Sequence, residues 1–168
     1  MKASKPVAAT PEQAPRTWRG GIPLQSLYTA GLGGQVFFKA LKERGEIVGT
    51  RCRDCKQVYV PARAFCERCF RPTDDWVYVQ DTGKVNTFSL CYVSWDVQRL
   101  KTPEIPAVIE IDGAAPGEGI MHKLGNVKPK DVRVGMKVRA VWKPAGERTG
   151  GITDIKYFEP IKGGSKKR

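Results

Sequence analysis

Two closely spaced pairs of cysteines constrain this chain more than any other feature. Each pair has the form Cys-x2-Cys, so one tight turn can aim both thiolates at a single ion, and residues 56–65 between the pairs can run out and back as a hairpin. Four thiolates suit a tetrahedral Zn²⁺ ion and leave no open coordination position for water. We therefore predict a zinc ribbon with a structural Zn²⁺ over residues 50–70. The predicted ligands are Cys52, Cys55, Cys66 and Cys69.

Other uses of the four cysteines remain open at this point. Iron takes the same four sulfurs in rubredoxin-like sites, so electron transfer is an alternative. Two disulfides are disfavoured, because the chain shows no signal peptide and this spacing in a reducing compartment favours a metal. Glycine often follows the second cysteine of such a turn, but Lys56 and Phe70 stand there. A positive φ at either residue would cost roughly 1–2 kcal/mol, which metal binding can offset.

The charge of the chain is concentrated toward its two ends. Of the net +12, residues 1–20 carry +3 and residues 161–168 carry +4, which leaves +5 for residues 21–160. Four thiolates and one Zn²⁺ lower this value further, so the folded part is mildly basic and is not a typical phosphate-backbone footprint. No apolar run approaches the ~20 residues that cross a bilayer. We expect a soluble, cytoplasmic protein with no membrane partner.

The two ends of the chain are expected to be separate from its folded part. Residues 1–33 lack hydrophobic periodicity and are rich in glycine toward their end, which predicts a flexible arm followed by a glycine-rich loop. Trp18 is the exception within the arm, and it is either an anchor for a partner surface or a residue folded back on its own domain. Residues 161–168 are predicted to form a basic tail.

A short helix is predicted at residues 35–44, directly before the cysteine motif. Phe37 and Leu41 are spaced i, i+4 on one apolar face, and Gly45 supplies the C-terminal stop. A short strand at Ile47 and Val48 then leads into the first cysteine turn. Helix and ribbon together make up a predicted unit over residues 34–75.

The remaining part, residues 76–160, shows strand signals and little helical periodicity. The first two predicted strands flank Asp81-Thr82-Gly83, a hairpin or bulge signal. Five or six strands with a longer connection in the middle fit a five-stranded OB-type barrel, so the predicted fold class is mainly β. Periodicity alone equally allows an SH3-like barrel or a small sandwich. The predicted strands are 76–80, 85–93, 105–111, 119–124, 136–142 and 152–158.

The order of these elements and two stretches of sequence resemble a known family. The stretches are residues 45–55 (GEIVGTRCRDC) and residues 131–138 (DVRVGMKV). They are similar to two-domain proteins in which a rubredoxin-like zinc ribbon precedes a C-terminal OB fold and which act with acyl-CoA enzymes. The resemblance covers roughly residues 34–159. Members are accessory subunits more often than lone catalysts, and they are found with thiolases, including one that cleaves a benzoylsuccinyl-CoA, with 3-hydroxy-3-methylglutaryl-CoA synthase and with hydratases.

The resemblance implies a noncatalytic subunit of an acyl-CoA-processing hetero-oligomer, most often with a thiolase, which helps to hold CoA or acyl-CoA. A few Lys and Arg side chains at a barrel mouth suffice to bind the CoA phosphates. For each such residue a solvated surface charge is the ordinary explanation. The candidates, all near predicted loops, are Lys84, Arg99, Lys101, Lys123, Lys128 and Lys130.

The sequence offers little that could catalyse a reaction on its own. His122 is the only histidine, and it lies in a predicted strand, where a structural role is expected. Cys91, the only cysteine outside the metal motif, is expected to be a buried, unreactive thiol. We find no Gly-x-Ser-x-Gly elbow and no carboxylate pair that names an acid and a base. We therefore predict no catalytic residues.

A nucleic-acid-binding module is the alternative function. Zinc ribbons and OB barrels both serve in that role, and Phe88, Tyr92 and Trp95 are aromatic side chains that can stack on bases. Phe88 and Tyr92 share one face of the predicted strand, whereas Trp95 falls on the other face. The modest charge of the folded part argues against this alternative.

Overall fold

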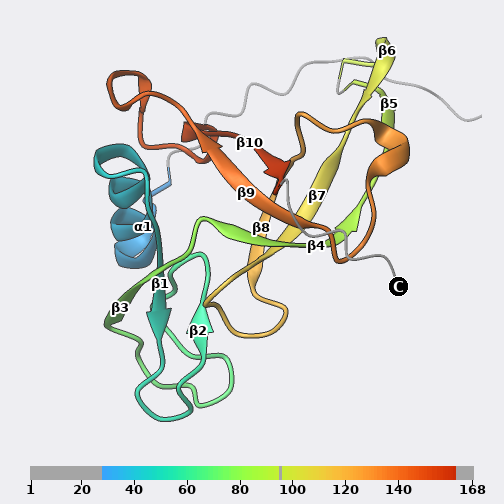
Figure 1. Ribbon diagram of the computed structural model, residues 1–168. Helices are drawn as coiled ribbons and strands as arrows, with labels where there is room; N and C mark the ends of the chain where they lie inside the picture. Colours follow the sequence, from blue (N-terminus) through green and yellow to red (C-terminus); the bar gives the residue numbers. More distant parts are fainter. Residues whose placement is uncertain (1–27, 95, 162–168) are drawn as a thin grey trace, which may run out of the picture.

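The computed structural model describes residues 28–94 and 96–161. These residues are mainly β, with one α-helix, a cysteine-bearing ribbon and a five-stranded barrel, as predicted (Figure 1). Trp18 and Trp95, and the residues around Trp18 in the predicted arm, lie outside the described part. Among the described residues, no helix has the length and apolar character that a membrane crossing needs.

Helix α1 (Gly31–Glu43) begins earlier than the predicted residue 35, because the glycine run forms its first turn. Gly33 lets the helix lie directly against the chain near Ala62, since a Cβ at Gly33 would be 2.6 Å from the Ala62 carbonyl oxygen. The apolar face buries Phe37 and Leu41, as the i, i+4 pattern predicts. Gly45 ends the helix with a φ of 68°, and its N–H bonds back to carbonyls of the last turn.

The ribbon contains an antiparallel sheet with the strand order β2-β1-β3. Its strands are β1 (Ile47–Arg51), β2 (Val58–Tyr59) and β3 (Asp75–Val79). The signal at Asp81-Thr82-Gly83 allowed a hairpin or a bulge between the strand at 76–80 and the next strand, and β3 does not pair with β4 (Thr82–Phe88). Instead β3 pairs with β1, with Ile47 opposite Val79. β1 is therefore the central strand, with a hydrogen-bonded neighbour on each side. Its residues Ile47 and Val48 are fully buried.

The barrel has the strand order β10-β9-β4-β7-β8. A parallel bridge between Leu124 and Phe158 joins its two ends, which closes the sheet as an OB-type barrel. Along β7 the buried side chains alternate as predicted, at Ala107, Ile109 and Ile111. The five strands are β4 (Thr82–Phe88), β7 (Pro106–Ile111), β8 (Gly119–Lys123), β9 (Lys137–Trp142) and β10 (Ile155–Pro160).

The predicted strand 85–93 is two strands in the structure. β4 ends at Phe88, and β5 (Cys91–Val93) pairs instead with β6 (Arg99–Glu104) in a two-stranded hairpin that projects at the upper right of Figure 1. We did not predict β6, because its sequence RLKTPE is polar, contains a proline and shows no regular alternation of apolar residues.

The predicted strand 152–158 also starts later, at Ile155, because a 3-10 turn occupies Ile152–Asp154. Asp154 causes this turn. Its carboxylate is fully buried and accepts backbone N–H bonds from Thr149 (2.9 Å) and Gly150 (2.8 Å). These bonds hold the loop from Thr149 to Asp154 over the barrel, next to α1.

One hydrophobic core runs through the helix, the ribbon sheet and the barrel. Leu41 of α1, Ile47 of β1 and Phe158 of β10 belong to it, and all three are fully buried. A separate small cluster around Cys52, Tyr59 and Cys66 lies at the other end of the ribbon. The ribbon is therefore attached to the barrel by shared packing, while its tip depends on what the cysteines bind.

Candidate functional site

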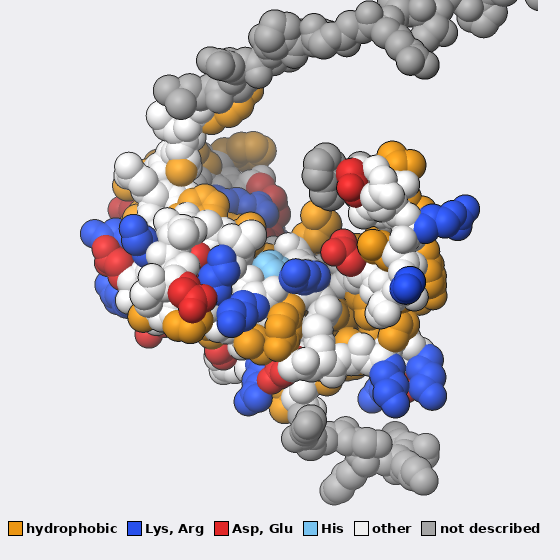
Figure 2. All heavy atoms as spheres, turned by 90° about the horizontal axis from the view of Figure 1, so that it is seen from above, with side chains coloured by type: hydrophobic (Ala, Val, Ile, Leu, Met, Phe, Trp, Pro, Cys, Tyr) orange, Lys and Arg blue, Asp and Glu red, His pale blue; other side chains and the backbone are white. Residues whose placement is uncertain are grey.

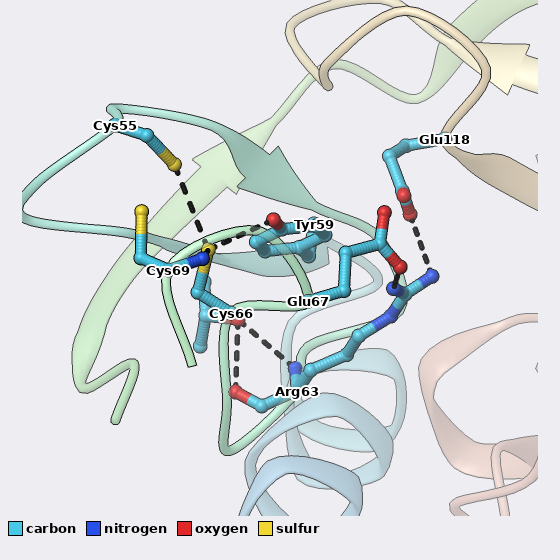
Figure 3. A network of polar contacts seen from close by, with 8 residues as sticks. Cys55, Tyr59, Arg63, Cys66, Glu67, Cys69 and Glu118 are labelled. Atoms are coloured by element: carbon cyan, nitrogen blue, oxygen red, sulfur yellow. Dashed lines mark hydrogen bonds and ion pairs between the residues drawn. The ribbon is translucent and has the colours of Figure 1, made fainter. Parts of the chain in front are cut away.

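The four predicted ligand cysteines come together at the tip of the ribbon. Their sulfur atoms all lie within 4.8 Å of one another, and Figure 3 shows three of these side chains pointing toward a common centre. The two turns that carry them have the same backbone hydrogen bond. Lys56 N–H donates to the Cys52 carbonyl (3.0 Å) in the first turn, and Phe70 N–H donates to the Cys66 carbonyl (2.9 Å) in the second.

The residue after each turn has a strained backbone conformation. Lys56 has a φ of 61° and Phe70 a φ of 54°, in the left-handed region that favours glycine. Each costs roughly 1–2 kcal/mol relative to an ordinary backbone conformation. The strain places both backbone N–H groups over the preceding cysteine carbonyls, and metal binding provides the free energy that offsets it.

Tyr59 supports the sulfur cluster from inside the ribbon. Its buried hydroxyl lies 3.1 Å from Cys66 Sγ, and the Cys69 backbone N–H donates to the same sulfur at 3.3 Å (Figure 3). The hydrogen bond to Cys66, together with burial, raises the pKa of Tyr59, so its hydroxyl stays protonated and donates. Burial alone would raise the pKa of the Cys66 thiol, but the bonds from Tyr59 and from backbone N–H groups lower it to about 6.

The donor set fits a dication. In the absence of a cation, the four sulfurs cannot all ionise easily. The hydrogen bond with Cys55 raises the pKa of the Cys69 thiol to about 12, and burial is the second largest cause. A Zn²⁺ ion would replace these protons and offset part of the negative charge of the four thiolates. Four sulfurs and no oxygen or nitrogen ligand give a closed tetrahedral shell, so the ion would hold the ribbon together and would not react with substrate.

Removing the Tyr59 hydroxyl should weaken metal binding without removing a ligand. We expect Tyr59→Phe to bind Zn²⁺ roughly tenfold more weakly, because hydrogen bonds to metal ligands typically contribute at this level. Competition with a chromophoric chelator measures the affinity. Tyr78→Phe is the matched control, since Tyr78 is exposed and lies outside the sulfur cluster. Equal affinities for the two variants would show that Tyr59 only fills space.

Arg63 joins the ribbon to the barrel. Its guanidinium donates to Glu67 of the ribbon (2.8 Å) and to Glu118 (2.9 Å), which lies directly before β8 (Figure 3). The Thr50 hydroxyl accepts from the Arg63 backbone N–H (2.9 Å) and donates to its carbonyl (3.0 Å). Burial raises the pKa of Glu118 although Arg63 opposes this. These contacts fix the direction in which the metal site points from the barrel.

In the structure, the six basic residues predicted to contact CoA lie on four separate segments of the barrel and of the β5–β6 hairpin. Lys84 on β4 is paired with Glu110 at 2.8 Å, and this contact raises its pKa. The other five have no ion pair within the described residues. They are Arg99 and Lys101 on β6, Lys123 at the end of β8, and Lys128 and Lys130 on either side of Pro129.

Two of these residues line hollows in the surface. Lys128 lines one of about 780 Å³, in which acidic and basic side chains alternate, with Asp112 paired to Lys137 at 2.8 Å. Lys123 lines a smaller hollow together with His122, Lys143 and Lys156. We did not predict Lys143 or Lys156. They follow or belong to strands far from Lys123 in the sequence, and only the closure of the barrel brings them together.

The two candidate reactive side chains have structural surroundings. The His122 ring packs edge-to-face on Phe158, with ring centroids 5.9 Å apart. Cys91 is half-buried, less than we expected, and its sulfur lies 4.0 Å from the Ser89 hydroxyl. Within the described residues, His122 makes no hydrogen bond to a serine or cysteine side chain. No nucleophile and base are therefore paired there.

The aromatic residues proposed to stack on bases do not form a common platform. Phe88 packs against the core, whereas Tyr92 is exposed on the projecting hairpin. This arrangement gives the nucleic-acid alternative no support from these two residues.

Two domain descriptions match the chain. Residues 40–75 match "ChsH2, rubredoxin-like zinc ribbon domain", and residues 76–143 match "ChsH2, C-terminal OB-fold domain". A DUF35 domain-containing scaffold protein of Methanocaldococcus jannaschii is 34% identical over 127 residues, which are 74% of this chain and 88% of that protein. A protein of the same description from Methanothermobacter thermautotrophicus is 20% identical over 111 residues, covering 66% of this chain and 81% of the relative.

Solved structures share the fold. A DUF35 protein of unknown function from Sulfolobus solfataricus is 27% identical with a TM-score of 0.56, over 66% of this chain and 78% of that one. The structure described as "Ltp2-ChsH2(DUF35) aldolase" matches at 22% identity with a TM-score of 0.56, over 76% and 93% of the two chains. The sulfur cluster, the closed barrel and the matches to both domains all indicate a zinc ribbon followed by an OB fold. The chain belongs to the ChsH2-like, or DUF35, family, whose members join a rubredoxin-like zinc ribbon to a C-terminal OB fold.

Proposed function

We propose that this chain is a noncatalytic accessory subunit of an acyl-CoA-processing complex and that its partner is a thiolase. The observation that carries the proposal is the 34% identity to a scaffold protein over 88% of that protein's length, which takes in both the ribbon and the barrel. The structural neighbour described as "Ltp2-ChsH2(DUF35) aldolase" supports a role beside an enzyme subunit. The acyl-CoA and thiolase parts of the proposal rest on the resemblance of the sequence stretches described above.

The distribution of titratable groups supports a role without chemistry of its own. Four of the five cysteines gather at the ribbon tip, where they would hold a structural Zn²⁺. Several basic side chains are occupied by carboxylates that fix strands or loops, as in the pairs Lys84–Glu110 and Arg139–Glu159. The reaction would then take place on the partner, and this chain would position the thioester and stabilise the assembly.

In this role the basic residues without ion pairs would contact the phosphates of CoA. We keep Arg99, Lys101, Lys123, Lys128 and Lys130 as candidates on this ground, whereas Lys84 already has a carboxylate partner. An ammonium group gains most from a phosphate when no carboxylate competes for it.

Purification from the native source tests the proposal. An affinity-tagged full-length chain, expressed at its normal level, should recover an enzyme that acts on CoA thioesters, and thiolase activity should travel with the chain through size-exclusion chromatography. The isolated chain should show no thioester turnover. Recovery of the chain alone would contradict the accessory role, and recovery of a different class of enzyme would contradict the thiolase assignment.

A further inference from the structure

A hollow of about 390 Å³ lies where β8, β10 and the end of β9 meet the 3-10 turn Ile152–Asp154. We call it the lysine pocket. Its polar lining consists of His122, Lys123, Lys143, Thr153, Lys156 and Tyr157. Figure 2 shows this side of the molecule: the partly buried histidine is visible near the centre of the view, with Lys or Arg side chains beside it.

The lysine pocket has an unbalanced charge. Three ammonium groups line it, and no aspartate or glutamate is among its described lining residues. None of the three lysines has an ion pair within residues 28–94 and 96–161. In the larger hollow of the barrel, by contrast, Lys137 pairs with Asp112 at 2.8 Å. The three ammonium groups repel one another, and an anion that enters the hollow is attracted by all of them.

The backbone around the pocket is held in place independently of any ligand. The Lys143 N–H donates to the Asp154 carbonyl at 2.9 Å, and the Asp154 carboxylate in turn fixes the preceding loop. His122 rests on the fully buried Phe158. Tyr157 accepts a hydrogen bond from the Asn126 side chain at 3.0 Å, so its own hydroxyl proton remains available to a ligand. Fixed donors bind an anion with less loss of entropy than mobile ones.

We infer that the lysine pocket binds the phosphate group of a small phosphorylated ligand. A phosphomonoester carries up to two negative charges and three acceptor oxygens, which matches several ammonium groups supported by hydroxyl donors. Lys123, Lys143 and Lys156 supply the charge, and Thr153 and Tyr157 supply neutral donors.

A second hollow of about 320 Å³ adjoins the pocket and shares Lys123 and Tyr157 with it. Ile105, Leu124 and Pro129 are among its lining residues, and one carboxylate, Glu104, lines it as well. A ligand with a phosphate at one end and a longer, uncharged arm suits the two hollows together. That the ligand is CoA or its thioester rests on the proposed function, whereas phosphate binding itself does not.

His122 reports on the pocket. Burial is the largest influence on the pKa of His122 and lowers it. The positive charge of Lys123 also lowers this pKa, whereas hydrogen bonds to backbone carbonyls raise it. A bound dianion stabilises the imidazolium form, so binding must raise this pKa. Because the chain has a single histidine, its ring protons can be followed by NMR without ambiguity.

The test is a pH titration of His122 in the full-length, zinc-loaded chain at constant ionic strength. It is run with chloride only, with inorganic phosphate, with CoA and with dephospho-CoA, which lacks the 3′-phosphate. We expect a saturable rise of the His122 pKa with phosphate and CoA. The double variant K143Q/K156Q should bind at least about tenfold more weakly. The double variant K39Q/K42Q removes the same charge from α1 and should bind within about twofold of the parent chain.

Three results would overturn the inference. They are the absence of any saturable change at His122, equal losses in the two double variants, and displacement of CoA by a single-stranded oligonucleotide that binds more tightly than CoA does. Tighter binding of CoA than of inorganic phosphate would identify the phosphorylated cofactor as the source of the group. If the purification recovers an enzyme partner but this titration fails, the pocket is rejected and the accessory role stands. If phosphate binds but the purification recovers no partner, the accessory role is rejected and the pocket stands.

Discussion

Replacing Cys52 with serine should prevent the ribbon from folding. Cys52 is fully buried and belongs to the small cluster with Tyr59 and Cys66, which has little hydrophobic packing apart from the cysteines themselves. Structural Zn²⁺ sites supply on the order of 10–16 kcal/mol of apparent binding free energy, about as much as the whole stability of an ordinary domain. Losing one of four ligands therefore removes most of what holds the ribbon tip together.

Near-UV circular dichroism and limited proteolysis would measure this effect. We expect Cys52→Ser to lose zinc and to be cleaved rapidly within the ribbon, between the two cysteine turns. Cys91→Ser is the matched control, because Cys91 lies on the β5–β6 hairpin outside the sulfur cluster, and it should remain protected. Protection of both variants would mean that packing alone folds the ribbon.

Asp154→Ala should lower the free energy of unfolding by about 2–4 kcal/mol, because it leaves buried backbone donors without an acceptor. The carboxylate accepts the N–H groups of Thr149, Gly150 and Gly151, at 2.9, 2.8 and 3.3 Å. Urea unfolding measures the loss. Asp131→Asn is the control, because Asp131 is exposed on the barrel surface, and it should change the stability by less than about 0.5 kcal/mol.

The same carboxylate makes part of the stability depend on pH. Burial alone would raise the pKa of Asp154, but the backbone hydrogen bonds outweigh burial and hold it below the ordinary value of 3.8. The unfolded chain therefore takes up the proton first as the pH falls. The contribution is complete above about pH 3.8 and is lost as the pH drops through the folded pKa. The stability difference between the parent chain and Asp154→Asn should shrink in that range, and a constant difference would contradict this assignment.

The local features of the fold could be predicted from the sequence. The spacing of the cysteines determines their turns, so the sulfur cluster followed from short-range geometry. The alternation of buried residues along β7 and the stop at Gly45 are equally local. These local sequence signals predict the structure correctly because the tertiary contacts favour the same conformations.

The errors concern pairings between distant residues. The turn signal at Asp81-Thr82-Gly83 gave no indication that β3 pairs with β1 in the ribbon sheet. The glycine run in α1 suggested a loop, because its low helix propensity is overridden by close packing of Gly33 against Ala62. The lysine pocket could not be predicted either, because it also depends on pairings between distant residues. Lys123, Lys143 and Lys156 become neighbours only when β8, β9 and β10 close the barrel.

The metal content of the natively folded chain tests the central claim most directly. Four sulfurs would bind one redox-inactive ion that organises the ribbon and takes no part in a reaction. Elemental analysis of the full-length protein, purified without added metal, should find one zinc per chain and a colourless solution. A well-folded chain without zinc, or one with stoichiometric iron and the red colour of a ferric thiolate site, would contradict it.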